Sequence, residues 1–256
     1  MPTFKNFPQG LTNGTTLSTS LSTTSGDKMN INISASGDLY ADNTITFASQ
    51  GNVGQTWQLV NDNGGVTNAA FPGAGTTLNE TSAIAIKMTG IWLTAMPNVL
   101  QRILDVRNTT TGTIARAYLT TGNFPMLQTS NNGASAVTVF TGTQALVHDF
   151  EYRFELGLTI ATSGATLNFD TYLANNPSPL SGNSYTSSAG STGTGAVNLI
   201  NYMQGSVAGG GTWVARFGGF EAVTGSATEI GPYVSPAGRP HPIKVYSQAV
   251  KRAGTW

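Results

Sequence analysis

The stretch from Asp149 to Ala161 constrains the fold more than any other part of the chain. Apolar side chains recur at every second position, and polar side chains occupy most positions between them. The apolar series is Tyr152, Phe154, Leu156, Leu158 and Ile160. A period of two predicts a β-strand with one buried face. Residues 165–173 alternate in the same way after a Thr-Ser-Gly link, so the two segments should pair as a hairpin in the middle of a sheet.

Further strands are expected along the rest of the chain. Residues 83–93 are apolar at nearly every position, which is typical of a strand buried on both faces, and Gly90 within them indicates a β-bulge. The links at 108–112 and 131–133 should each close a hairpin, because Asn and Gly tolerate the positive φ of tight turns. The other expected strands are residues 44–47, 57–60, 102–107, 113–119, 124–129, 136–141, 196–203 and 213–223.

Composition supports an all-β fold. Of the 256 residues 9% are charged and 39% are hydrophobic, and much of the remainder is Thr, Ser, Asn and Gly. Neutral polar residues favour turns and strand surfaces, and no window combines strong helix formers with a 3.6-residue period, so we expect almost no helix. No internal repeat holds over three units. Hairpins of uneven spacing favour a two-sheet antiparallel jelly-roll sandwich over a solenoid or propeller.

Two segments interrupt the strand pattern. Residues 174–195 are rich in Asn, Ser, Thr and Gly, and we expect a long exposed loop there. From residue 231 the chain becomes rich in proline, which cannot sit in the middle of a sheet. We therefore divide the chain into a sandwich with an N-terminal arm, residues 1–230, and a C-terminal tail, residues 231–256, that docks on a neighbour or on its own domain.

Charge and cysteine content exclude several classes of function. The formal net charge is zero, so the chain lacks the positive excess that dominates nucleic-acid binding, and near-zero charge suits a component of an assembly. The absence of cysteine excludes disulfides and thiolate metal sites. No apolar run is long enough for membrane insertion and no signal peptide opens the chain, so we expect a protein synthesised in the host cytoplasm and kept soluble in its producing cell.

The acidic side chains of the 149–161 stretch are the first candidates for catalysis. Asp149, Glu151 and Glu155 share one parity, as catalytic carboxylates on a sandwich strand would. The α-carbons of Glu151 and Glu155 lie about 13 Å apart in an extended strand, whereas retaining glycosidases place their carboxyl groups about 5.5 Å apart. Arg153 on the same face stabilises charged carboxylates and does not produce an acid with a raised pKa. We therefore predict no catalytic residue and a solvated sheet face with cross-strand ion pairs.

Metal and cofactor sites find little support. His148 and His241 are the only histidines, are far apart in sequence and lack further zinc ligands. The glycines at 209–211 precede no helix, so they do not form a phosphate-binding loop. Three aspartates offer oxygen ligands for calcium without a recognisable ligand spacing: Asp27, Asp38 and Asp62. We expect no cofactor and no metal.

Carbohydrate binding is the more serious possibility. Sugars stack on exposed aromatic rings, and Tyr185 and Tyr202 lie in or beside the polar segment that ends at residue 195. Most aromatic residues of a sandwich belong to its core, and we expect this of Phe154, Phe169 and Phe217. Tyr185 and Tyr202 are therefore the two candidate glycan contacts.

Four segments carry a resemblance to a known family. They are Phe7–Thr15 (Phe-x-x-Gly-Leu-x-Asn-Gly-Thr), Ser25-Gly26-Asp27, Asp149–Glu155 and Gly211–Val223. With these segments the chain resembles the concanavalin A-like, laminin-G-like jelly-roll proteins of actinobacterial tailed phages, over residues 4–230. Such proteins are assigned as minor tail or other virion proteins.

The resemblance implies a non-enzymatic structural component of a virion, at the tail tip or in a fibre and present in several copies. Its expected partners are other virion proteins, further copies of the chain and host cell-surface polysaccharide. A capsid decoration or head-fibre protein is the alternative within the same class. A glycan-active hydrolase on the same fold is the alternative from a different class.

Overall fold

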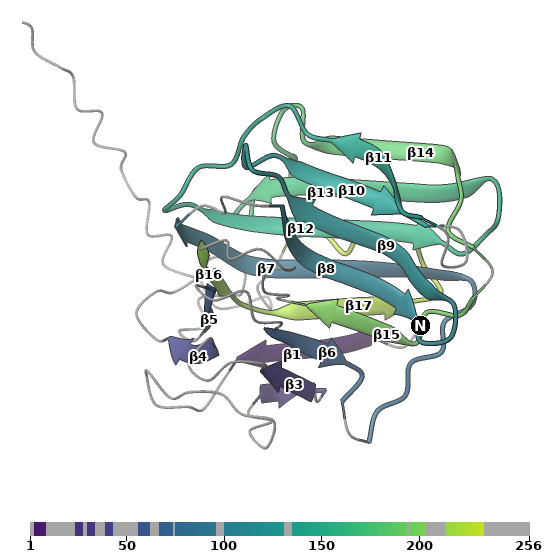
Figure 1. The fold of residues 1–256 in the computed structure, drawn as a ribbon, viewed down its shortest axis with the longest axis horizontal. Coiled ribbons are helices and arrows are strands. Elements are labelled where there is room, and N and C mark those ends of the chain that lie inside the picture. The colour runs from purple at the N-terminus through teal and green to yellow at the C-terminus, as the bar shows by residue number, and fades with distance from the viewer. Residues whose placement is uncertain are drawn as a thin grey trace, which may run out of the picture.

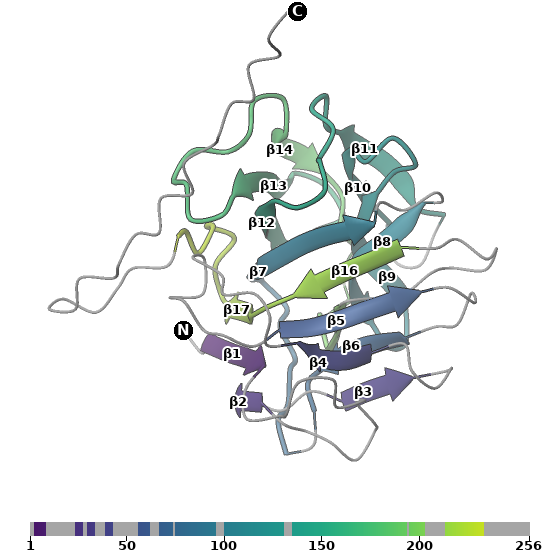
Figure 2. The ribbon, with the colours of Figure 1, turned by 90° about the vertical axis from the view of Figure 1, so that its left-hand side faces the viewer.

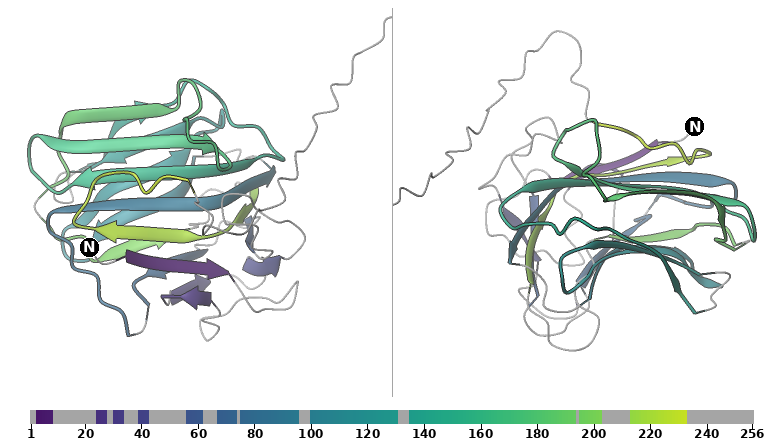
Figure 3. Two further views of the ribbon diagram at one scale, coloured as in Figure 1. Left: turned by 180° about the vertical axis from the view of Figure 1, so that it is seen from behind. Right: turned by 90° about the horizontal axis from the view of Figure 1, so that it is seen from above.

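The computed structural model describes residues 3–8, 24–27, 30–33, 39–42, 56–61, 67–73, 75–95, 100–130, 135–193, 195–202 and 213–232. These residues form strands and turns without any helix, and the strands build two antiparallel sheets packed face to face (Figures 1 and 3). The expected all-β jelly-roll sandwich is confirmed. Within the same residues, no helix has the length and hydropathy that crossing a membrane requires.

The larger sheet has ten strands among the described residues. They are β1 (Thr3–Pro8), β2 (Thr24–Gly26), β4 (Leu39–Asp42), β5 (Thr56–Asn61), β7 (Ala83–Ala95), β12 (Glu151–Thr159), β13 (Ala165–Leu173), β14 (Ser184–Gly190), β16 (Trp213–Phe217) and β17 (Phe220–Thr224). Their main order is β14-β13-β12-β7-β16-β5-β4, and β17 also pairs with β7 and leads to β1 and β2 (Figure 2). The N-terminal arm is therefore a strand of this sheet.

The smaller sheet has seven strands among the described residues. They are β3 (Asn30–Ile33), β6 (Thr67–Phe71), β8 (Gln101–Asn108), β9 (Gly112–Leu119), β10 (Pro125–Thr129), β11 (Val137–Thr141) and β15 (Leu199–Tyr202). Their order is β11-β10-β9-β8-β15-β6-β3. The expected pairings of β8 with β9 and of β10 with β11 are confirmed.

The hairpin predicted from the period-two pattern is present. β12 and β13 are antiparallel, and their register sets Leu158 opposite Leu167 and Tyr152 opposite Leu173. The other edge of β12 pairs with β7, so β12 lies inside the sheet as predicted. Its predicted apolar face, with Phe154 and Leu156, belongs to the buried core.

β7 bulges where the glycine predicted it. Thr89 and Gly90 together stand opposite the single residue Arg153, because Met88 pairs with Phe154 and Ile91 with Tyr152. Gly90 has a φ of 65°, a conformation that favours glycine. The strand predicted at 213–223 is in fact two strands, since residues 218–219 separate β16 from β17 opposite this bulge. Two successive glycines have no side chains to pack, so the strand breaks there. Beyond β7, the sheet therefore continues in two directions, through β16 to β5 and through β17 to β1.

The long exposed loop predicted for 174–195 contains a strand. β14 pairs with β13, with Tyr185 opposite Phe169 and Thr186 opposite Asn168, and forms an edge of the larger sheet. An edge strand exposed to water needs few apolar residues, so its Ser- and Thr-rich composition resembled that of a loop.

The core fills the space between the sheets. Phe154 and Phe169 stack with ring centroids 6.2 Å apart, and the rings of Phe71 and Phe220 lie 5.6 Å apart. Phe154, Phe169 and Phe217 are fully buried, as predicted for core aromatics. Several predicted features lie outside the described residues: the strand at 44–47, the turn at 131–133, the glycines at 209–211, Asp38, Asp62, His241 and the tail from residue 233.

Candidate functional site

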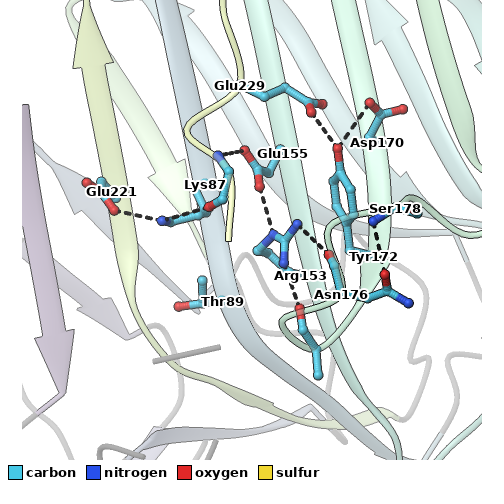
Figure 4. Close-up of polar contacts among 12 residues, drawn as sticks. Lys87, Thr89, Arg153, Glu155, Asp170, Tyr172, Asn176, Ser178, Glu221 and Glu229 are labelled. Carbon is cyan, nitrogen blue, oxygen red and sulfur yellow. Dashed lines mark hydrogen bonds and ion pairs between the residues drawn. The ribbon is translucent and has the colours of Figure 1, made fainter. Parts of the chain in front are cut away.

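A row of charged side chains crosses the outer face of the larger sheet (Figure 4). Each member of the row is the direct cross-strand partner of the next, from β1 through β17, β7 and β12 to β13. In this order the members are Lys5, Glu221, Lys87, Glu155 and Asp170. The signs alternate and stabilise neighbouring strands until the last step, where two carboxylates stand side by side.

Glu221 is held between two lysines. Its carboxylate oxygens lie 2.7 Å from Nζ of Lys5 and 3.0 Å from Nζ of Lys87. Burial acts to raise the pKa of Glu221, but the two ammonium groups outweigh it and hold this pKa below its usual value. Glu221 therefore stays ionised and links β1 to β7 through β17.

Glu155 pairs with an arginine of its own strand. Nε of Arg153 lies 2.7 Å from Oε1 of Glu155, and both side chains are fully buried. The guanidinium also donates to the carbonyl oxygens of Ala174 and Asn176, at 2.8 and 3.1 Å, and lies 4.0 Å from the centroid of the Tyr172 ring. The prediction of a solvated face is therefore wrong, although its ion pairs are present.

The face is buried because a segment of the chain covers it. Residues 225–232, here called the strap, run across the outer side of the sheet after β17 (Figure 3). The amide of Gly231 donates to Oε2 of Glu155 at 2.8 Å, and Nζ of Lys87 donates to the Gly231 carbonyl at 3.1 Å. The strap thus belongs to the sandwich, while the rest of the predicted tail lies outside the described residues.

A glycine in β12 makes room for the strap. A Cβ atom on Gly157 would lie 1.9 Å from the carbonyl oxygen of Ala227. Asn168, the cross-strand partner of Gly157, donates to the same carbonyl at 3.3 Å. The strap can therefore lie flat on the sheet only where β12 has no side chain.

Asp170 and Glu229 share a tyrosine. The Tyr172 hydroxyl lies 2.5 Å from Oε2 of Glu229 and 3.4 Å from Oδ2 of Asp170. Burial, reinforced by the neighbouring Asp170, raises the pKa of Glu229 to about 8. Burial and the hydrogen bond to Glu229 also raise the pKa of the Tyr172 hydroxyl. Glu229 thus keeps its proton near neutral pH.

This proton should make the stability of the fold depend on pH. Folded Glu229 keeps its proton up to about pH 8, whereas the unfolded chain releases it near pH 4.5, so the folded state binds more protons between these values. Stability should therefore fall as pH rises through this window. Thermal unfolding from pH 5 to pH 9 measures the slope, and Glu229→Gln, which cannot ionise, should flatten it. Equal slopes in both proteins would contradict the assignment.

The carboxylates of this face are engaged with the protein itself. Both oxygens of Glu155 accept hydrogen bonds, from Arg153 and from the Gly231 amide. Asp170 and Glu229 face each other across the Tyr172 hydroxyl, beside a hollow of about 400 Å³. A glycosidase needs two carboxyl groups that flank a sugar bond. The arrangement can hold a proton on Glu229 and stabilise the strap on the sheet. The expectation that no residue is catalytic stays a prediction.

The two candidate tyrosines have different environments. Tyr202 is 1% exposed, packs against the rings of Phe217 and Phe220, and donates its hydroxyl to the Gly218 carbonyl at 3.3 Å. Its prediction as a glycan contact is wrong, because β15 points this ring into the core. Tyr185 is half-buried on β14 and stacks on Phe140 with centroids 5.2 Å apart. Tyr185 remains a candidate.

The remaining predicted ligands are not brought together. His148 is exposed, and its Nδ1 lies 2.7 Å from Oδ2 of Asp149. In the part of the chain that the structure describes, no group of three or more His, Asp or Glu side chains could hold a metal ion. The sequence reasoning also missed Lys87, Tyr172 and Glu229. Lys87 had a usable signal, since it is the only charge in the apolar run 83–93, but nothing local distinguishes the other two.

The two packed antiparallel sheets define a β-sandwich of the jelly-roll kind. The chain is similar to the binding domain of botulinum neurotoxin serotype G, with a TM-score of 0.55 and 9% identity over 88% of this chain and 48% of that one. A protein of unknown function from Shewanella oneidensis MR-1 has a TM-score of 0.52 and 14% identity, over 86% and 84% of the two chains. The chain thus spans about half the length of the neurotoxin domain. No family model and no curated protein matches the sequence.

Proposed function

We propose that the chain is a non-enzymatic structural component of a tailed-phage virion, a minor tail protein of the tail tip or a fibre that contacts host surface glycans. The sequence resemblance over residues 4–230 motivates this proposal, and the lectin-like fold is compatible with it. The observation that carries it is a pair of open sheet edges at one end of the sandwich.

These edges are β14 of the larger sheet and β11 of the smaller one, which lie at the same end of the molecule (Figure 1). Neither strand contains a charged residue or a proline, and Val137 in β11 is 63% exposed. Proteins that stay monomeric usually protect edge strands with charges, prolines or bulges. The β10–β11 and β13–β14 pairings each contain one register irregularity, but among the described residues no charge, proline or further strand protects either edge. Such edges on a chain of zero net charge suit repeated association with further copies or with other virion proteins.

The alternatives have less support. A hydrolase needs accessible carboxylates, and Glu155 is fully buried with both of its oxygens occupied. A capsid decoration or head-fibre protein would use the same open edges, so only its position on the particle separates it from a tail protein.

Mass spectrometry and immunogold labelling of purified particles test the proposal. The expected result is the chain in stoichiometric amount with gold at the tail tip. Label on the head would favour decoration, and a chain that is absent from particles but releases reducing sugar would support the hydrolase. Light scattering of the full chain should show a defined oligomer.

Replacing Tyr185 with alanine should weaken binding to host cell-wall polysaccharide by about three- to tenfold, because a stacking surface is lost. Titration of the purified protein by calorimetry measures the change. Tyr202→Phe is the control, since it alters a buried ring of the same kind and should leave binding unchanged. Identical affinity of Tyr185→Ala and the unaltered chain would remove Tyr185 from the glycan site.

A further inference from the structure

The smaller sheet lies on the side of the sandwich opposite the strap (Figures 1 and 3). Its outer face carries a second charged cluster. Asp105 of β8 stands directly opposite Arg116 of β9, and Arg102 and Arg107 lie on the same strand as Asp105. The residues before and after Asp105 belong to the buried core. Because side chains alternate along a strand, the Asp105 carboxylate lies on the outer face.

Three arginines converge on this one carboxylate. Oδ1 of Asp105 lies 3.3 Å from Nε of Arg116 and accepts a hydrogen bond from Thr113 at 3.1 Å. Oδ2 lies 3.1 Å from Nη1 of Arg102 and 3.9 Å from Nε of Arg107. Asp105 is fully buried beneath them. Its carboxylate therefore orients the guanidinium groups and neutralises a single charge.

The cluster has an excess of positive charge. Asp105 is the sole acidic residue in the seven described strands of the smaller sheet, and Arg102, Arg107 and Arg116 are their sole basic residues, so the charge is 3 − 1 = +2. The strap face, by contrast, is nearly balanced. Its charged groups are Lys5, Lys87, Arg153, Glu155, Asp170, Glu221 and Glu229. Among the described strands, the positive excess thus lies on the smaller sheet.

Two of the arginines remain partly exposed to solvent. The side chain of Arg107 is 38% exposed and that of Arg116 is 25% exposed, while Nε of Arg107 is buried without a hydrogen-bond partner. Planar guanidinium groups bind carboxylate and phosphate oxygens in pairs. Neutral side chains adjoin them on the neighbouring strands, with Asn201 opposite Asp105 and Gln128 opposite Arg116.

We propose that Arg107 and Arg116, oriented by Asp105, bind the carboxylate or phosphate groups of an anionic polysaccharide. This inference rests on the proposed function as a host-glycan contact and specifies the charge of the glycan. The zero net charge of the protein disfavours a nucleic acid, whose binding depends on a larger positive excess.

Calorimetric titration of the full chain tests the site with polygalacturonate, poly(glycerol phosphate) and neutral dextran. The first two separate carboxylate from phosphate, and binding should weaken as salt increases. Arg107→Gln and Arg116→Gln should each lower the affinity for the bound polyanion about tenfold, the size expected for a lost charge-assisted hydrogen bond. Arg116→Lys keeps the positive charge and loses the planar guanidinium group, so its affinity should lie between those of the unaltered chain and Arg116→Gln.

Lys5→Gln is the matched control, because it removes one positive charge from the opposite sheet and should leave affinity unchanged. Thermal unfolding of each variant verifies the fold. Equal affinities of Arg107→Gln and Lys5→Gln, or no binding of either polyanion by the unaltered chain, would overturn the site. If the chain binds a polyanion but is absent from purified particles, the site is supported and the virion proposal is refuted. If the chain is present in particles but binds neither polyanion, the virion proposal is supported and the site is refuted.

Discussion

Replacing Arg153 with methionine is expected to lower the free energy of unfolding by about 3–5 kcal/mol. Arg153 and Glu155 are both fully buried and paired at 2.7 Å, so the substitution leaves a carboxylate charge without its partner in the interior. It also removes the donor to the carbonyl oxygens of Ala174 and Asn176. Equilibrium urea unfolding, followed by tryptophan fluorescence and extrapolated to water, measures the loss.

A double variant separates charge from packing. Arg153→Met combined with Glu155→Gln should recover part of the loss, because glutamine is neutral and its side-chain oxygen can still accept from the Gly231 amide. Lys5→Met, which removes the half-exposed lysine while Glu221 keeps its ion pair with Lys87, should cost less than about 1 kcal/mol. If the free energy of unfolding of the single Arg153→Met variant also fell by less than about 1 kcal/mol, the buried ion pair would not be the main stabilising contact of this face.

Replacing Gly157 with alanine is expected to displace the strap and to destabilise the fold by about 1–3 kcal/mol. In an ordinary strand the same change is favourable, because alanine loses less backbone entropy on folding. Here the added Cβ would lie 1.9 Å from the carbonyl oxygen of Ala227, a backbone atom that can move only if the strap moves. Hydrogen exchange followed by mass spectrometry should show lost protection across residues 225–232.

Gly122→Ala provides the comparison. Its Cβ would lie 2.7 Å from the edge of the Phe124 ring, a side chain that can rotate away, so the cost should be small. Unchanged protection of the strap in Gly157→Ala would mean that the strap adapts to the methyl group. The role of Gly157 in seating the strap would then be refuted.

The two outer faces of the sandwich differ in what remains open to a partner. On the larger sheet the charged row is nearly balanced and the protein's own strap covers it, with Glu155 fully buried. On the smaller sheet Arg107 and Arg116 remain partly exposed around one neutralising carboxylate. An anionic polysaccharide is therefore expected on the second face, and the first contributes mainly to stability.

Some features could be predicted because their causes are local. The alternation from Tyr152 to Ile160 predicted the β12–β13 hairpin, since a buried sheet face selects apolar residues at every second position. Gly90 predicted the bulge in β7, because its φ of 65° favours a residue without a side chain. The all-β class followed from a composition poor in helix formers and rich in turn residues.

Other features depend on contacts between segments far apart in sequence. The sequence of β14 predicts a loop, because an edge strand exposed to solvent has no apolar pattern. It forms a strand through its hydrogen bonds to β13. The sequence places Tyr202 beside a polar segment and predicts an exposed ring. β15 lies between β6 and β8 in the smaller sheet, and the Tyr202 ring therefore packs in the core. Neither outcome has a signal in the neighbouring residues.

The sequence by itself determined the sandwich, its central hairpin and the strand that carries Arg153 and Glu155, because periodicity records which face of a strand is buried. Only the tertiary structure decided that this polar face is also buried. That outcome requires the strap to bring Gly231 onto Glu155, 76 residues away in sequence, and Glu229 onto Tyr172, 57 residues away. Strand pairing of β8 with β9 likewise adds Arg116 to the two arginines of β8 that lie beside Asp105. The register between strands and the path of the strap depend on the packing of the whole fold, so the residues next to them in sequence give no signal that predicts them.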